Sequence, residues 1–166
     1  MKSARSAGFE PVPSGPFGTR DKTGRDISVF SKIMTPVDLA HLGGLQRALD
    51  CAADLAGHYG ADLVYVGVTA ETPGPLGHNP AEYAKRLEAF AAEQAKAHGI
   101  VATVHAMAAH DPTTDLDDNL FKAIEETGAD LVVMQSHIPN LTDYIWPSNG
   151  GKLAAHAKVS VMVVRD

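Results

Sequence analysis

The chain has 166 residues, of which 45% are hydrophobic and 20% charged, a composition typical of a folded globular protein and not of a disordered one. Its net charge of −6 argues against nucleic acid as a partner, because phosphate backbones are bound by clustered Lys and Arg. The one cysteine, Cys51, excludes an internal disulfide, and no apolar run approaches the length needed to cross a bilayer. We therefore expect a cytoplasmic protein of one domain that does not span a membrane.

The first 28 residues differ from the rest of the chain. Gly and Pro recur between Gly8 and Gly24, and aliphatic residues are almost absent there. Such a segment sustains neither a helix nor a central strand. We predict a flexible N-terminal extension over residues 1–28, which is either an interaction tail or a segment without a fixed role, and a single domain over residues 29–166.

The remaining chain alternates apolar runs with amphipathic segments. The apolar runs predict strands over residues 32–37, 63–68, 101–107, 129–135 and 160–165. Leu and Ala at spacings of three and four predict helices over about residues 43–58, 81–98, 115–126 and 148–157. Three of these helices are followed by Gly60, Gly99 and Gly128, which suit C-cap positions. This order predicts an α/β fold with a five-stranded parallel, doubly wound sheet and helices on both faces.

Ligands of doubly wound sheets bind beyond the carboxyl ends of the strands, where the strand order reverses. The informative segments are therefore residues 36–41, 67–72, 107–113 and 135–149.

Two segments carry a family resemblance. The first runs from Lys32 to Asp38 (Lys-Ile-Met-Thr-Pro-Val-Asp) and continues through an Ala- and Leu-rich helix to Gly-Ala-Asp-Leu at residues 60–63. The second is Ala-Asp-Leu-Val-Val-Met-Gln-Ser-His-Ile-Pro at residues 129–139, followed by Tyr144, Ser148-Asn149 and the C-terminal strand. Together they resemble the universal stress protein family, in the branch with a Gly-Ser-His-Arg-Pro loop and a later Gly-Ser-Asn.

The resemblance implies a Rossmann-like sheet of the adenine nucleotide alpha hydrolase type, with strand order 3-2-1-4-5. It also implies a homodimer formed through the C-terminal strand, which as an apolar sheet edge is prone to pair with a partner. The function implied is that of a stress-response regulatory protein, whose ligand state alters the surface offered to a protein partner that the sequence does not identify.

The resemblance further implies a crevice for ATP or AMP at the ends of the first and fourth strands. The nucleotide-binding positions that it transfers to this chain are Pro36, Val37, Asp38, Val66, Ser136, His137, Pro139, Ser148 and Asn149. The Asp38 carboxylate can accept hydrogen bonds from a ribose hydroxyl or an adenine amine, or it only caps the loop before the first helix. Ser148 likewise either meets phosphate or serves as a helix N-cap.

The phosphate loop departs from the family pattern at three positions. Gln135 replaces a glycine, Ile138 replaces the arginine, and Pro147, which has no N–H to donate, replaces the glycine before Ser148. We therefore expect ATP, with its Mg²⁺, or AMP to bind weakly or not at all. The alternative is a dimeric interaction module of the same fold that binds no nucleotide and uses its surface.

Signatures of catalysis and of metal binding are weak. The sequence has no Walker lysine loop, Gly-x-Ser-x-Gly or kinase motif, and we expect no enzyme activity beyond weak ATP hydrolysis. His105, His110 and His137 fall near predicted strand ends. Because no His-x-x-x-His or Cys-x-x-Cys spacing is present, no metal site is expected.

Overall fold

The computed structural model describes residues 28–112, 114–135 and 149–165, and the predicted N-terminal extension before residue 28 lies outside them. The five strands are β1 (Lys32–Pro36), β2 (Asp62–Ala70), β3 (Ala102–Ala109), β4 (Leu131–Gln135) and β5 (Ser160–Val164). The helices are η1, a 3-10 turn (Leu42–Gly44), α1 (Gln46–Tyr59), α2 (Pro80–His98), α3 (Leu116–Thr127) and α4 (Asn149–His156).

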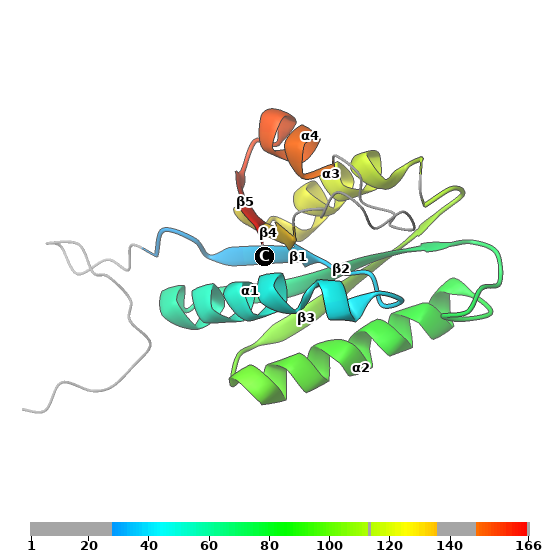
Figure 1. Cartoon of the computed structure of the whole chain (residues 1–166), viewed down its shortest axis with the longest axis horizontal. Helices are drawn as coiled ribbons and strands as arrows, with labels where there is room; N and C mark the ends of the chain where they lie inside the picture. The colour runs from blue at the N-terminus through cyan, green and yellow to red at the C-terminus, as the bar shows by residue number, and fades with distance from the viewer. Residues whose placement is uncertain (1–27, 113, 136–148, 166) are drawn as a thin grey trace, which may run out of the picture.

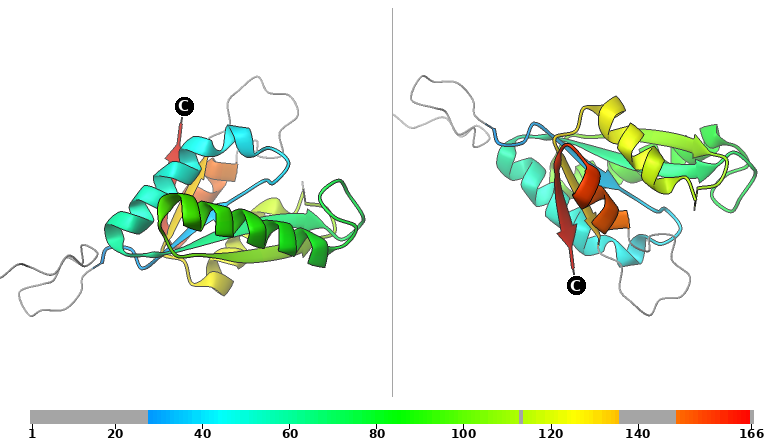
Figure 2. Two further views of the ribbon diagram at one scale, coloured as in Figure 1. Left: turned by 90° about the horizontal axis from the view of Figure 1, so that it is seen from below. Right: turned by 90° about the horizontal axis from the view of Figure 1, so that it is seen from above.

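The strands form one parallel sheet in the order β3-β2-β1-β4-β5, which confirms the predicted fold class and strand order. Helices α1 and α2 cover one face of the sheet, and α3 and α4 cover the other (Figures 1 and 2). The chain therefore changes face between α2 and α3, as a doubly wound sheet requires.

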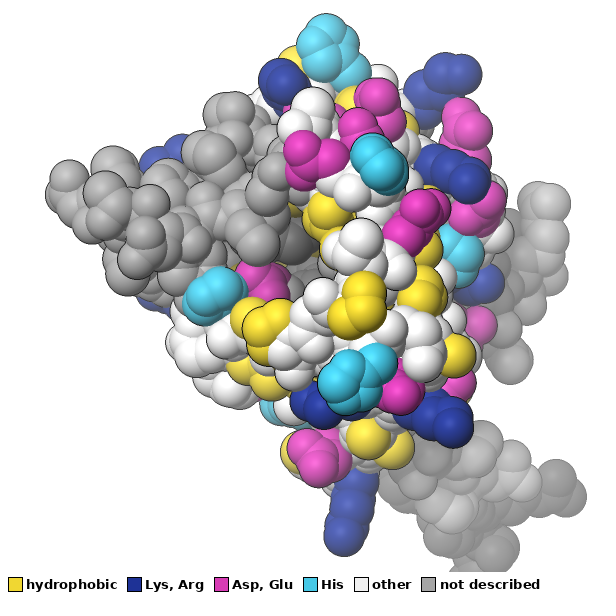
Figure 3. Space-filling view, turned by 90° about the vertical axis from the view of Figure 1, so that its right-hand side faces the viewer, with side chains coloured by type: hydrophobic (Ala, Val, Ile, Leu, Met, Phe, Trp, Pro, Cys, Tyr) yellow, Lys and Arg dark blue, Asp and Glu magenta, His cyan; other side chains and the backbone are white. Residues whose placement is uncertain are grey.

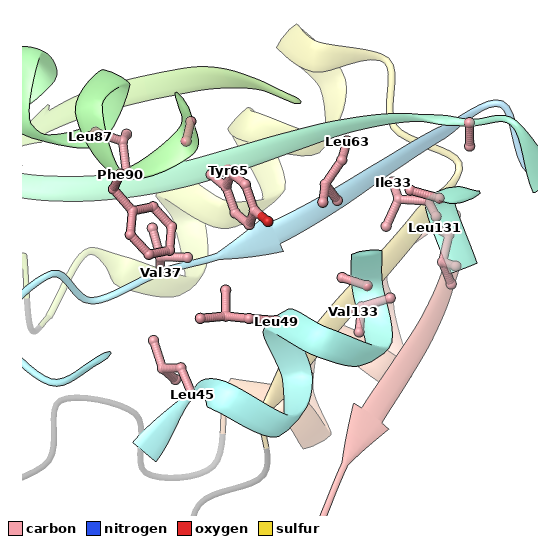
Figure 4. Packing of buried hydrophobic residues seen from close by; sticks show 14 of the residues in the cluster. Ile33, Val37, Leu45, Leu49, Leu63, Tyr65, Leu87, Phe90, Leu131 and Val133 are labelled. Carbon is pink, nitrogen blue, oxygen red and sulfur yellow. The ribbon is translucent and has the colours of Figure 1, made fainter. Parts of the chain in front are cut away.

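The core has two apolar layers, one on each face of the sheet. Neighbouring residues of a strand point to opposite faces, so Ile33 packs with α1 and α2 while Met34 packs with α3 and α4. Figure 4 shows the first layer, in which Tyr65 and Phe90 meet edge to face with ring centroids 5.2 Å apart. Burial on both faces explains why the central strands are nearly continuous apolar runs.

The predicted helix ends are confirmed by backbone geometry. Gly60, Gly99 and Gly128 are the C-caps of α1, α2 and α3, all with positive φ between 64° and 68°. The predicted start of the first helix at Gly43 is wrong, because Leu42–Gly44 forms a separate 3-10 turn and α1 begins at Gln46. Two consecutive glycines, Gly43 and Gly44, explain the late start, since glycine is a poor helix former.

Strands β2 and β3 extend beyond their predicted ends. They pair over eight positions, from Leu63 with Ala102 to Ala70 with Ala109. β1 stops at Pro36, and its ladder with β4 covers only Ile33 and Met34. The sheet is therefore longer on the β2–β3 side at its carboxyl end, and this step bounds the site described next.

Candidate functional site

Strands β1, β2 and β3 run toward the right-hand side of the molecule in Figure 1, and this side faces the viewer in Figure 3. The ladder between β1 and β4 ends before either strand does, and the connections leave these two strands toward opposite faces of the sheet. This is the topological switch point at which doubly wound proteins bind ligands.

A pocket of about 210 Å³ opens beside this point. It is lined by Val37, Asp38 and Ala40 after β1, by Val68–Ala70 of β2, by residues 72–77 of the β2–α2 loop, by Tyr83 of α2, and by Pro112 and Leu116. Most of these side chains are apolar, and none of the described lining residues is Lys or Arg. A pocket of this size and character suits a compact ring system, since sites for larger ligands occupy roughly 300–1,000 Å³.

Asp38 is the one carboxylate among the lining residues that the structure describes. Its side chain is 11% exposed. One oxygen accepts the backbone N–H of Ala40 at 2.9 Å, and the other lies 2.8 Å from Nδ1 of His41. The loop-capping interpretation of Asp38 is therefore realised here. Each carboxylate oxygen has a second lone pair, so the same geometry also orients Asp38 toward a ligand.

Val37, Val66 and Pro36 are the three aliphatic residues next to β1 and β2 that were predicted for the site, and only Val37 lines the pocket. Val37 lines the pocket, and its N–H donates to the carbonyl of Val66 at 2.8 Å, which adds one rung to the β1–β2 ladder. Val66 itself packs on the opposite face, in the layer beneath α3 and α4. Pro36 is buried and is not a lining residue. Val68 lies two residues further along the same face of β2, nearer the carboxyl end of the strand, and lines the pocket instead.

The outer wall is the β2–α2 loop, whose shape is held by local hydrogen bonds. Gly74 and Gly77 exchange two backbone hydrogen bonds of 2.9 and 3.2 Å, which closes the loop into a tight turn. Asn79 then caps α2 by accepting the N–H of Glu82, and the Glu82 carboxylate accepts the N–H of His78. This capping box fixes the direction in which α2 leaves the pocket.

Tyr83 and Gly67 form a close contact at the inner side of the pocket. The Tyr83 side chain is buried, 2% exposed, and reaches from α2 across β2. A Cβ atom at position 67 would lie 2.3 Å from the Tyr83 hydroxyl oxygen, so the ring fits only because residue 67 is glycine. Neither residue is among the predicted site residues, although Gly67 begins one of the informative segments and a glycine inside an apolar strand is a signal of close approach.

Four of the predicted phosphate-contacting residues, Ser136, His137, Pro139 and Ser148, lie outside the described residues. Asn149 is the first residue of α4, and its side chain is not described. Gln135 is the last residue of β4, the strand next to β1 in the sheet, and residues 136–148 follow it. The described pocket lies on the β1 and β2 side of the predicted crevice, and none of its described lining residues belongs to β4.

The histidines near the strand ends are not gathered around one point. Nε2 of His105 lies 2.9 Å from Oε2 of Glu126 on α3, and His110 is exposed. Within residues 28–112, 114–135 and 149–165, no group of three or more His, Cys, Asp or Glu side chains is arranged to hold a metal ion. A search of the same residues finds no helix with the length and apolar character of a membrane span.

The sheet order and the pocket at its switch point define an α/β protein of the doubly wound class. The model of the universal stress protein family matches residues 30–165, and the chain belongs to that family.

Solved structures of the same family share the fold. A universal stress protein crystallised in complex with cAMP has a TM-score of 0.60 and 19% identity, over 82% of this chain and 97% of that one. The Archaeoglobus fulgidus protein in complex with dAMP has a TM-score of 0.56 and 18% identity, over 81% and 98%. An Arabidopsis thaliana family member with AMP bound has a TM-score of 0.57 and 12% identity, over 81% and 91%.

Proposed function

We propose that this chain is a stress-response regulatory protein that binds an adenine nucleotide, AMP or ATP with Mg²⁺, in the pocket beyond β1 and β2. The observation that carries the proposal is the place of Val37 and Asp38: both follow β1 directly, and both line a pocket beside the switch point. The cAMP, dAMP and AMP in the related structures support adenine as the base.

The described pocket suits the nucleoside half of such a ligand. Its lining is mainly apolar and carries no Lys or Arg within the described residues, so phosphates would be held elsewhere, by the segment after Gln135. That segment has Ile138 in place of arginine and Pro147 in place of glycine. Loss of one charge-assisted contact and one N–H donor weakens binding by about one to two decades. We therefore propose weak ATP binding, with adenosine and AMP losing least.

Thermal unfolding with and without ligand tests this proposal. A ligand at about 100 times its Kd adds about 2.7 kcal/mol, or roughly 5–10 °C for a domain of this size. We expect adenosine, AMP and Mg-ATP at millimolar concentration to raise the melting temperature, and GTP to leave it unchanged. No shift with any adenine compound would contradict the proposal.

Two sets of variants separate the halves of the site. Asp38→Asn should weaken adenosine and AMP alike, whereas Asp54→Asn, an exposed aspartate of α1, is the matched control. Gln135→Gly with Pro147→Gly should strengthen ATP more than adenosine, because it restores backbone donors only where phosphates lie. Equal effects of the double change on adenosine and ATP would refute this division.

We propose a binding protein and not an enzyme, with at most slow ATP hydrolysis, because no base or metal-ligand set faces the pocket among the described residues. Phosphate release in the presence of Mg-ATP measures this directly. Turnover faster than about one per minute would contradict it, since typical enzymes reach about 1–1,000 per second.

One observation favours the dimeric interaction module as a second function. β5 pairs only with β4 in the described sheet, which leaves its other edge open, and Met162 on this strand is 42% exposed. Open apolar edges recruit a further strand. We propose a homodimer through β5. Sedimentation tests this proposal. The native chain should sediment as a dimer and Met162→Lys as a monomer, and identical masses for the two would contradict it.

A further inference from the structure

The Tyr83 hydroxyl is a polar group at the pocket that the proposed function has not used. Tyr83 is 2% exposed, and it is one of the pocket's lining residues. In the part of the chain that the structure describes, no hydrogen bond involves its hydroxyl. The Tyr83 hydroxyl is not one of the fully buried polar atoms that lack a hydrogen bond, so it is open to a ligand or water on the pocket side. A hydroxyl that is open to the pocket and has no protein partner can donate its proton to a bound ligand.

Gly67 gives this hydroxyl its position. A Cβ at residue 67 would stand 2.3 Å from the Tyr83 oxygen and 3.0 Å from the two nearest ring carbons. Any residue larger than glycine would therefore push the hydroxyl end of the ring aside. Glycine in the middle of β2 weakens the strand, because it adds no side chain to the core. Residue 67 therefore adds no side chain to the core, and the Tyr83 ring occupies the space that such a side chain would fill.

The chemistry of the hydroxyl complements that of Asp38. Burial raises the pKa of Tyr83 well above its usual range, and the Asp38 carboxylate raises it further. The group therefore stays a neutral phenol at every physiological pH and can donate its proton to a ligand. Asp38, when ionised, only accepts. The two side chains thus offer a ligand one donor and one acceptor in the same pocket.

A heterocyclic base fits this combination better than a phosphate or a sugar does. Besides Tyr83, the apolar lining of the pocket includes Val37, Val68 and Leu76, which suit the faces of a flat ring. Ring nitrogens are acceptors for a phenol, and an exocyclic amine is a donor for a carboxylate. A phosphate in this position would lie near the Asp38 carboxylate with no Lys or Arg among the described lining residues.

We propose that Tyr83 reads the base of the bound nucleotide by donating its hydroxyl proton to a ring nitrogen, and that Gly67 is the residue that admits it. This assignment rests on the proposed function and adds a specificity-determining contact to it. A donor in the wall of the pocket favours ligands with the matching acceptor, because ligands that lack it bind without that hydrogen bond.

The first experiment compares Tyr83→Phe with Tyr65→Phe by calorimetric titration with adenosine. The two changes remove the same atom from two buried tyrosines of the same core, but only Tyr83 lines the pocket. We expect Tyr83→Phe to weaken adenosine about 3- to 10-fold, as one net hydrogen bond predicts, and Tyr65→Phe to leave its Kd unchanged. Both variants should melt near the native temperature without ligand, since neither hydroxyl has a partner among the described residues.

A set of deaza-adenosines, each lacking one ring nitrogen, then identifies the acceptor. One analogue should bind the native chain about 3- to 10-fold more weakly than adenosine, and it should bind Tyr83→Phe as adenosine does. Gly67→Ala provides the second arm. It should weaken adenosine in the native background and cause no further loss when combined with Tyr83→Phe, because the displaced hydroxyl is already absent.

The outcomes separate this inference from the proposed function. Adenosine that binds native protein and Tyr83→Phe equally would overturn the role of Tyr83 and leave the nucleotide site standing. Equal losses in Tyr83→Phe and Tyr65→Phe would also overturn it, because the effect would then be a general one of the core. An absence of binding to the native chain at millimolar adenosine and AMP would overturn both.

Discussion

Asp130 provides a sharp test of how the sheet is held at its amino end. One carboxylate oxygen accepts the N–H of Ser31 at 2.7 Å and its hydroxyl at 2.6 Å, and the other accepts the N–H of Lys32 at 3.0 Å. The backbone of Asp130 also bonds Lys32 and Ser160. The Asp130 side chain therefore joins the start of β1 to that of β4, while its backbone carbonyl reaches β5, and replacing the side chain should loosen the start of β1.

The expected magnitude follows from the three accepted bonds. Hydrogen bonds to a charged group contribute about 1.5–3 kcal/mol each when buried, and less where solvent screens them, as at this half-buried site. We expect Asp130→Ala to lower the free energy of unfolding by about 2–3 kcal/mol, or the melting temperature by roughly 4–12 °C. Asp130→Asn keeps one carbonyl oxygen and should lose about 1–2 kcal/mol.

The pH dependence has a definite sign. Burial alone would raise the pKa of Asp130, but the hydrogen bonds from the Ser31 hydroxyl and from the amides of Ser31 and Lys32 outweigh it and lower the pKa below its ordinary 3.8. The stabilisation is therefore fully present above the unfolded-state pKa and is lost as pH falls through the lower folded-state value. The difference between the native chain and Asp130→Asn should shrink below about pH 4.

Urea unfolding followed by circular dichroism at pH 7 and pH 3.5 measures both effects. Asp62→Ala is the matched control, because Asp62 stands in the same Ala-Asp-Leu context at the start of β2 and is exposed. If Asp130→Ala costs no more than Asp62→Ala, the carboxylate does not hold the strands together. If the difference in free energy of unfolding between the native chain and Asp130→Asn stays constant down to pH 3.5, the stabilisation does not depend on an ionised Asp130 carboxylate.

Four further substitutions test the fold, each by urea unfolding. Thr35→Val should leave stability unchanged or raise it by up to about 1 kcal/mol, because the buried Thr35 hydroxyl has no partner among the described residues; a loss above about 1 kcal/mol would reveal a bond. Gly128→Ala should cost about 1 kcal/mol, since φ is 68° there, whereas Gly57→Ala inside α1 should stabilise by a similar amount; equal signs would contradict the backbone geometry. Leu120→Ala, at a fully buried position, should cost about 2–5 kcal/mol, and a loss below about 1 kcal/mol would argue against the packing beneath α3.

Most of the fold was predictable because its signals are local. Apolar runs marked every strand, and Gly60, Gly99 and Gly128 marked three helix ends in advance. Alternation of strands and helices then restricted the architecture to a doubly wound sheet. The family resemblance supplied the strand order, which local patterns alone do not determine.

The site was predictable only where it follows directly from a strand end. Val37 and Asp38 come straight after β1, and both line the pocket. Val66 was transferred from the family resemblance, but it is buried in the layer beneath α3 and α4, whereas Val68, two residues further along the same face of β2, lines the pocket. Tyr83 reaches the pocket through a contact between α2 and β2 that depends on Gly67, and a contact between distant segments leaves no local pattern.

Amide spectra of the labelled protein titrated with AMP test the central claim most directly, because they report both binding and its place. We predict saturable shifts at Val37, Asp38, Val68 and Leu76, around the pocket at the carboxyl ends of β1 and β2. Spectra that do not change at millimolar AMP, or changes confined to β5 and the amino ends of the strands, would contradict a nucleotide site in this pocket.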